Sequence, residues 1–597
     1  MAADTLLQHL PNLVDLESLE ALAARLPEPA QAALRYAADT LEKLAASTAQ
    51  TPRRKLIAAS VASYLAARIV LSLARNALHR RRLLARNPFL RVVPVTSLES
   101  VLAGTTLGQM TRNPHEAIGA MTALAPKGHV TTGPMGKPHL WVSDPRAIHA
   151  MLVTHARRFE RTKIARQLLA WATGPLGLLT LEGDDHRRHR RIINPVFNLK
   201  NLRTLTPVIA EAAREMSAAV SGGGAAVNVE FTDLASKVAL NIIGRTTMAM
   251  DFDALNEKQP SPLTEAYHEM TTIMEVYPLA RLSRPMPWIN SIPFLKHARV
   301  FDQAKAVVSR HVDLIVTAFT DAASAGKVPG ASTGVVTTPS LVAALLAGSK
   351  SGDAALSREE LRSELLSFLS AGHETTAMTY AMAVWELGRP HNADIQTALR
   401  TEVRRVLSDH HDDAAAAYDA LAGCAQLTAV INETLRVHTP AYLIGRRAMA
   451  RASLPLEDGS TLEVDKEQII FIPVAAIQRS VRQWGPGAHE WSPRRWLRDD
   501  DHGTAALRVA ADYESGIEDT LASPIDNGQG SSDKWFEPFA MGPHACIGRQ
   551  FAIMELRVLL AQLVADIMWT SQDETVAMRW GITAGPMSVK IQAMRVQ

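Results

Sequence analysis

Cysteine is almost absent from this chain of 597 residues, which contains only Cys424 and Cys546. Two cysteines cannot build the disulfide framework that supports small secreted domains, so a reducing compartment is expected. Aromatic residues are also scarce, at 5%, whereas hydrophobic residues reach 47% and include many alanines. This composition predicts an ordinary globular protein in which helix dominates.

A second absence concerns nucleotide binding. No glycine-rich phosphate-binding fingerprint follows a strand-like segment, so the chain has no evident nicotinamide or flavin domain of its own. The net charge of +3 indicates no partner by itself. We expect no nucleic acid partner.

Acidic residues are missing between Arg53 and Leu98, where ten lysines and arginines surround the moderately apolar run Leu56 to Ala74. This asymmetry in segment 53–90 is typical of contact with a membrane surface. Arg68 lies near the middle of the run and costs roughly 2.5 to 3.5 kcal/mol in a spanning helix. A spanning helix, an interfacial helix and a soluble amphipathic helix all stay open. Residues 1–52 are expected to form a small helical extension without visible chemistry.

Cys546 stands in a turn formed by Gly542 to Ala545, with a helical run expected from Ile547 onward. A thiol at a helix N-terminus is favoured as the thiolate, because unpaired N–H groups and the helix dipole stabilise negative charge there. A thiolate is a metal ligand. The alternative is a buried free cysteine, which is common in intracellular proteins.

The residues around this cysteine follow the spacing Phe-x-x-Gly-x-His-x-Cys-x-Gly, from Phe539 through Gly542, His544 and Cys546 to Gly548. The pattern resembles the heme-binding loop of the cytochrome P450 family. The resemblance implies heme b with Cys546 as the axial iron ligand and the other four residues around the cofactor. The family usually has arginine in place of His544, whose shorter side chain has less reach toward a heme propionate.

A long helix is expected from about Ser357 through Leu387, with Ser357 and Glu360 forming a capping box at its start. It contains the run Ala-Gly-His-Glu-Thr-Thr at 371–376. Glycine costs about 1 kcal/mol against alanine inside a helix, which indicates a local opening for a ligand. The run resembles the family's oxygen-binding helix. The resemblance implies roles for Ala371 and Gly372 beside dioxygen, for Thr375 as its hydrogen-bond partner and for Glu374 in relaying protons.

Two further groups match the family. His186 and Arg190 are four residues apart and share a helical face. Their segment resembles the family's helix that crosses the heme, so both are expected at a propionate, with Arg446 as a further propionate contact. Glu433, Arg436 and Arg495 match the family's buried charge triad, which implies structural support for the cysteine loop.

The resemblance covers residues 91–597 and implies one heme domain of mainly α structure with a small β-sheet region, including strands near 128–132 and 139–142. Residues 499–532, acidic and rich in glycine and serine, are expected to be a disordered insertion. An apolar substrate pocket is expected from Phe368, Ala371, Leu443 and Ile444.

The implied activity is that of a heme-thiolate monooxygenase. One atom of O2 enters a lipophilic substrate by hydroxylation or epoxidation, the substrate being a fatty acid or a secondary metabolite. Electrons would come from a separate NADPH-cytochrome P450 reductase, and the enzyme would lie on the endoplasmic reticulum with its catalytic domain in the cytosol. The alternatives are a heme-thiolate isomerase or dehydratase that needs no electrons, and a heme-binding sensor without turnover.

Overall fold

The computed structural model describes residues 71–93, 118–120, 122–123, 125–133, 136–220, 225–255, 262–276, 296–324, 340–348, 356–410, 412–499, 505–507, 536–580 and 583–596. The predicted extension 1–52 and most of the apolar run 56–74 lie outside these residues. The chain divides into two compact units. The first comprises Met1–Phe159 with Gly445–Pro473, and the second comprises Glu160–Ile444 with Val474–Gln597. The heme domain expected over 91–597 includes residues of both units.

The first unit is built around a mixed sheet of order β1-β2-β3-β9-β6-β4. Strands β2 and β3 form an antiparallel hairpin, and β9 pairs with β3 in parallel. Every residue of β2 and β3 is buried, so both faces of the hairpin are covered. These strands confirm the two predicted near 128–132 and 139–142. The strands are β1 (Arg91–Val92), β2 (Gly128–Thr132), β3 (Pro138–Val142), β4 (Phe159–Arg161), β6 (Ile444–Ala448) and β9 (Ile469–Ile472).

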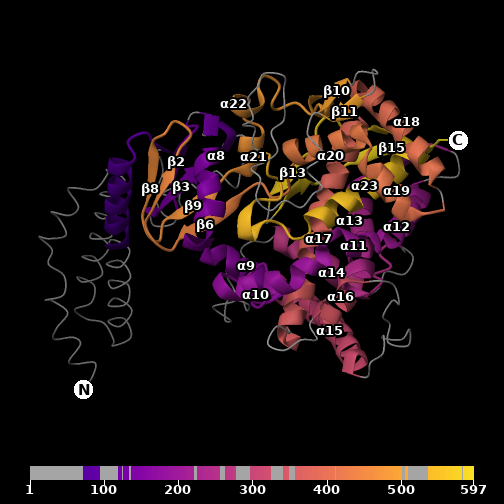
Figure 1. Ribbon diagram of the computed structural model, residues 1–597, viewed down its shortest axis with the longest axis horizontal. Coiled ribbons are helices and arrows are strands. Elements are labelled where there is room, and N and C mark those ends of the chain that lie inside the picture. The colour runs from indigo at the N-terminus through magenta and orange to yellow at the C-terminus, as the bar shows by residue number, and fades with distance from the viewer. Residues whose placement is uncertain are drawn as a thin grey trace, which may run out of the picture. The chain divides into compact units, whose positions relative to one another are not determined.

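The same unit contains α8 (Pro145–His149) and the hairpin of β7 (Ala452–Pro455) with β8 (Thr461–Val464), which lie close to this sheet in Figure 1. Asp144 begins α8 by accepting a hydrogen bond from the backbone N–H of Ala147, and proline occupies the first turn, as its fixed φ allows. Residues 71–86 are also helical.

The second unit is mainly helical (Figure 1), as the composition predicts. Its helices are α9 (Lys163–Thr173), α10 (Gly183–Ile193), α11 (Leu199–Arg203), α12 (Thr206–Val220), α13 (Phe231–Ile243), α14 (Pro262–Val276), α15 (Lys296–Ser324), α16 (Leu341–Gly348), α17 (Arg358–Leu387), α18 (Ala393–Asp409), α19 (Ala414–Ala422), α20 (Ala425–Val437), α21 (Val474–Gln478), α22 (Val481–Trp484) and α23 (Arg549–Asp566). Small sheets join β12 (Ile567–Ser571), β15 (Lys590–Arg595) and β5 (Val227–Glu230), and β13 (Met578–Trp580) with β14 (Ala584–Pro586).

Helix α17 is the central element of this unit. The predicted capping box is confirmed, because Ser357 accepts from the backbone N–H of Glu360 while the Glu360 carboxylate accepts from the backbone N–H of Ser357. Most of its 30 residues are buried, and it packs against α13, α20 and α23. A helix that is covered on nearly all sides belongs to the core.

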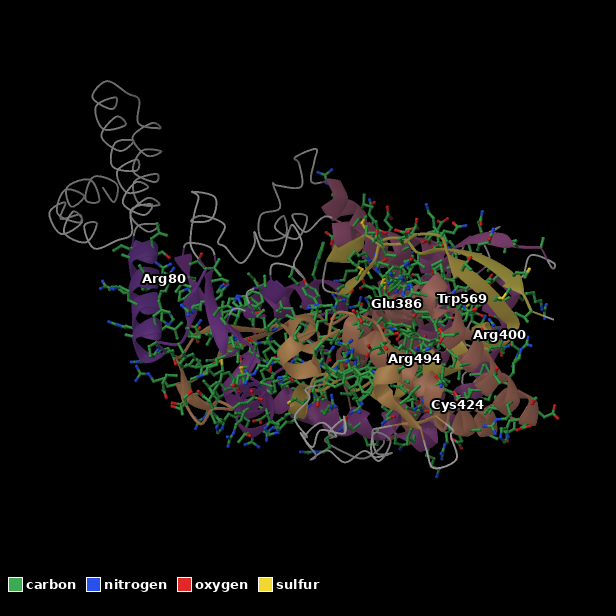
Figure 2. All side chains as sticks on the ribbon, turned by 90° about the horizontal axis from the view of Figure 1, so that it is seen from above. Arg80, Glu386, Arg400, Cys424, Arg494 and Trp569 are labelled. Atoms are coloured by element: carbon green, nitrogen blue, oxygen red, sulfur yellow. The ribbon has the colours of Figure 1, made fainter. Side chains whose placement is uncertain are left out.

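Hydrogen bonds from side chains to backbone carbonyls hold the C-terminal elements against this core. Trp569 of β12 donates from Nε1 to the carbonyl of Val384, at 2.8 Å, and Arg400 donates to the carbonyls of Val564 and Ile567, each at 2.9 Å. Figure 2 labels both residues together with Cys424.

Burial raises the pKa of the Cys424 thiol to about 12, so this cysteine stays neutral.

Only a small part of the predicted disordered insertion 499–532 falls within the described residues. Residues Ala505–Leu507 form β11, which pairs antiparallel with β10 (Leu497–Asp499). Residues 508–535 lie outside the described part of the chain. Within the described residues, no single helix is both long and apolar enough to cross a bilayer, and only the pair α19 and α20, bent by 72°, passes the same criteria of length and composition.

Candidate active site

A cavity of about 310 Å³ lies inside the second unit. It brings together the cysteine loop, α10 and α17, which are far apart in sequence. Of the residues proposed from the sequence, the following line it: His186, Arg190, Phe368, Ala371, Gly372, Thr375, Ile444, Phe539, His544, Cys546 and Gly548. Gly542, Glu374, Leu443 and Arg446 are not among its lining residues.

Cys546 is exposed toward this cavity, and its backbone N–H donates to the carbonyl of Phe539 at 2.8 Å. The helix that follows begins at Arg549, two residues later than expected, so the sulfur stands before the first turn and not within it. Burial raises the pKa of the Cys546 thiol, although the N–H of Gly548 and the charges of Arg190 and Arg549 act in the opposite direction. The expected thiolate is therefore not favoured by helix position alone. A bound metal cation would supply the missing stabilisation.

Two glycines shape the loop in different ways. Gly542 has φ of +72°, a backbone conformation that residues with a Cβ resist. Gly548 lines the cavity at the start of α23, and a Cβ there would point toward the sulfur of Cys546 at 4.0 Å. A side chain at position 548 would thus occupy space next to the sulfur.

One face of α17 forms a cavity wall, as the spacing of Phe368, Ala371, Gly372 and Thr375 predicts. The Thr375 hydroxyl donates to the carbonyl of Ala371 at 2.8 Å. A Cβ at Gly372 would lie 2.5 Å from Cδ1 of Ile243 on α13. The glycine therefore also permits close packing of two helices, a role that the sequence did not indicate.

Glu374 points away from that wall and lies near β13. Its Oε1 is 3.4 Å from Nη2 of Arg579, and the side chain is 17% exposed. The sequence gave no indication of Arg579, because nothing links β13 to α17 before the chain folds. The placement of Glu374 between the cavity helix and the surface is compatible with the proton relay implied by the resemblance.

A cluster of charged and aromatic nitrogen groups borders the cavity beside Ala545. Arg190 donates from Nη1 to the carbonyl of Ala545 at 2.5 Å, and the rings of His186 and His544 lie 4.1 Å apart at 33°. Burial lowers the pKa of His186 to about 3, and its Nε2 is buried without a hydrogen-bond partner in the described structure. A buried polar atom of this kind indicates a missing acceptor or donor.

Two residues that the sequence interpretation did not single out complete this cluster. Oε1 of Glu182 lies 3.0 Å from Nη1 of Arg161, and Oε2 of Glu182 lies 3.2 Å from Nε2 of His544. Burial would raise the pKa of Glu182, but the hydrogen bond from His544 and the charge of Arg161 outweigh it and lower that pKa to about 2. Arg446 lies on β6 in the first unit, where it donates to the carbonyl of Gly445. Its expected propionate contact stays a prediction.

The structure brings Glu433, Arg436 and Arg495 together. Arg436 makes two hydrogen bonds to the Glu433 carboxylate, both 2.8 Å, and Arg495 Nε lies 3.5 Å from the same carboxylate. Trp496 and the backbone N–H of Ser492 also donate to Glu433. This network joins α20 to the segment 484–496, which is the geometry that the resemblance implies for structural support.

The comparisons with known proteins identify the family. The family model for cytochrome P450 matches residues 103–586. The chain belongs to the cytochrome P450 family. Cytochrome P450 monooxygenase 205 of Postia placenta is 29% identical over 455 residues, covering 72% of this chain and 77% of its own length. Ganoderic acid synthetase CYP5150L8 of Ganoderma lucidum is 26% identical, with 71% and 78% covered, and cytochrome P450 monooxygenase FUM15 of Gibberella moniliformis is 26% identical, with 74% and 76% covered.

This P450 is an oxidoreductase of the monooxygenase class, and its family implies a heme iron cofactor. The residues present fit that group. Cys546 offers one sulfur to the cavity, and Gly548 leaves the space beside it open. The cations Arg161 and Arg190 and the unpartnered nitrogen of His186 border one side, which suits the two carboxylates of a heme.

Proposed function

We propose that this P450 hydroxylates or epoxidises a neutral, lipophilic substrate with electrons from a separate NADPH-dependent reductase. The observation that carries the proposal is the wall of the cavity away from the cationic cluster, which is apolar and includes Phe197, Phe368 and Ile243. Such walls bind ligands mainly through the area that they remove from water.

Three of the hydroxyl groups that line the cavity support a neutral substrate. Thr375, Thr379 and Ser367 each donate to a carbonyl of their own helix, at 2.8, 2.9 and 2.7 Å. Their protons are therefore committed. With the cationic side chains reserved for the heme's carboxylates, the described wall offers no charge for a carboxylate on the substrate. A secondary metabolite or an esterified acyl chain suits this wall better than a free fatty acid.

When bound, the heme would supply activation of dioxygen, and Cys546 as its thiolate ligand would donate electron density that favours O–O cleavage. Cys546 would hold the group by its sulfur. Thr375 places a hydroxyl on the wall of the cavity that α17 forms. Glu374, part-exposed on the same helix, can exchange protons with solvent and pass them inward.

Membrane attachment is the second part of the proposal. Residues 71–86 form a helix on which Leu71 and Leu78, seven residues apart, are 58% and 48% exposed. Arg75 and Arg82 share that helical face and are also exposed. Exposed leucines that alternate with arginines on one helical face support a position on an anionic membrane surface, such as the cytosolic face of the endoplasmic reticulum.

Spectroscopy and turnover test the function. We expect the reduced protein with carbon monoxide to show the red-shifted Soret band of thiolate ligation, and NADPH oxidation with a reductase to depend on substrate. Turnover without NADPH would instead indicate an isomerase, and heme binding without turnover a sensor. A protein without the red-shifted band would overturn the assignment.

A matched pair of ligands tests the neutral substrate. A long-chain fatty acid and its methyl ester share one acyl chain and differ in charge and by one methyl group, so we expect the ester to produce the larger shift of the ferric heme spectrum at equal concentration. Tighter binding of the acid would contradict the neutral pocket and favour a fatty acid hydroxylase.

A further inference from the structure

The His544 side chain is held by a chain of ionic contacts that begins outside the heme loop. Arg161, the last residue of β4, contacts Glu182 at the start of α10, and Glu182 contacts His544 in the heme loop. Three segments separated by 21 and 362 residues thus meet through one carboxylate. Both Arg161 and His544 line the cavity, whereas Glu182 does not.

Glu182 is fixed independently of His544. Its Oε1 accepts two hydrogen bonds from Arg161, one from the backbone N–H at 3.1 Å and one from the guanidinium at 3.0 Å. The guanidinium is itself held by the carbonyl of Leu181 at 3.1 Å. Glu182 occupies the N-cap position of α10 but makes no side-chain capping bond. Its carboxylate is committed to Arg161 and His544 instead of the helix.

The second oxygen of Glu182 restricts the imidazole of His544. Nε2 lies 3.2 Å from Oε2, and the ring packs on His186. A histidine whose one nitrogen is bound by a carboxylate has its ring orientation and tautomer fixed, which determines what the other nitrogen can do. The family's usual arginine would need no such help, since a guanidinium presents several donors on a longer chain.

We propose that Glu182 is a positioning residue for the heme: held by Arg161, it fixes His544 against His186, so that both rings are set where the heme's carboxylates bind. The inference rests on the heme binding proposed above. Elsewhere in the family, the longer arginine side chain provides the reach toward the heme carboxylate. In this chain the shorter His544 side chain is held in position by Glu182. Glu182 does not touch the heme itself.

The test compares the heme release of full-length, heme-loaded variants. In Glu182→Gln the side chain keeps its size, but the amide offers one acceptor oxygen and cannot accept from both Arg161 and His544. Transfer of heme to excess apomyoglobin is followed by absorbance, and we expect it to become about 10-fold faster. This is the lower end of the effect that follows when a binding histidine loses the partner that orients it. Asp185→Asn is the matched control. It removes the same charge from an exposed position in the same helical turn, and we expect the wild-type rate.

A second background separates positioning from a general effect on the fold. In His544→Arg the guanidinium no longer depends on Glu182, so adding Glu182→Gln should change heme release by less than about twofold, the scale of independent sites. If the Glu182→Gln protein is purified without heme, its heme occupancy is compared with that of the double variant. Recovery of heme by the double variant would then support the same conclusion.

Three results would overturn the inference. They are a wild-type release rate in Glu182→Gln, an equal acceleration by Glu182→Gln in the His544→Arg background, and an equal acceleration by Asp185→Asn. A wild-type protein that binds no heme would remove the proposed function along with this inference. Normal heme binding by the wild type with any of these three results removes the inference alone.

Discussion

Glu433 on α20 and Glu555 on α23 are both completely buried in the second unit, yet their surroundings are opposite. Glu433 accepts hydrogen bonds from Arg436, the backbone of Ser492 and Trp496. Neither oxygen of Glu555 has a hydrogen-bond partner within the described residues, and burial raises the pKa of Glu555 well above its usual range. A buried carboxyl group therefore stabilises this fold only where the chain supplies donors for it.

Removing Glu433 should produce the largest change. Glu433→Ala leaves Arg436 buried beside carbonyls without its counter-charge, which costs about 3 to 5 kcal/mol of unfolding free energy. Urea unfolding followed by far-UV circular dichroism measures this, and heme occupancy should fall with stability. A loss below about 1 kcal/mol, the range of an exposed ion pair, would show that the network is not the support of the cysteine loop.

The two carboxyl groups also differ in how well the sequence predicts them. Glu433 and Arg436 follow a helical i, i+3 spacing, and with Arg495 they match a family pattern, so their contact was expected. The lack of partners around Glu555 depends on which atoms meet it in three dimensions, and no local spacing encodes that. The same holds for the cavity: the faces of α10 and α17 follow from helical periodicity, whereas Arg161, Glu182 and Arg579 join the site only through tertiary contacts.

The thiol of Cys546 shows the same limit. The sequence places it correctly in a loop before a helix, and the expected thiolate follows from that local position. Burial depends on the elements that close over the loop, among them α10 and α17, and it opposes the thiolate. Local motifs therefore predict the ligand, but the energy of ionising it depends on the whole fold.

Glu555→Gln tests the other half of the comparison. Because the folded-state pKa of Glu555 is raised, the folded protein keeps a proton that the unfolded chain releases above about pH 4.5, so the contribution of Glu555 to stability falls as pH rises. The slope of that contribution is up to about 1.4 kcal/mol per pH unit, and Glu555→Gln should remove it. Denaturant unfolding of both proteins at pH 5 and pH 7 measures it as the difference between variant and wild type, with the variant gaining relative to the wild type at pH 7. If the stability of both proteins changed by the same amount between the two pH values, Glu555 would have a partner that offsets its burial.

A buried basic group in the first unit, the imidazole of His129, extends the comparison. His129 is stacked on Trp141, and neither of its ring nitrogens has a hydrogen-bond partner in the described structure. Burial lowers its pKa to about 4, so the stability that neutral His129 contributes is complete above pH 6.5 and is lost as the pH falls toward 4. His129→Phe should therefore gain about 2 kcal/mol relative to wild type on going from pH 7 to pH 5. Unfolding at both pH values measures it, with His391→Phe at an exposed position as the control.

The smallest effect is expected where the Glu433 network reaches the surface. Arg495 is 16% exposed and lies at the longest distance from Glu433, 3.5 Å, while its other nitrogens donate to the carbonyls of Trp484 and Gly487. Arg495→Gln leaves the closer pair of Glu433 and Arg436 intact, and water can reach the vacated carbonyls, so we expect a loss of only about 1 to 2 kcal/mol with heme retained. Urea unfolding beside Glu433→Ala provides the comparison on one scale. A loss as large as that of Glu433→Ala would mean that the third charge, and not the buried pair, holds the segment 484–496 in place.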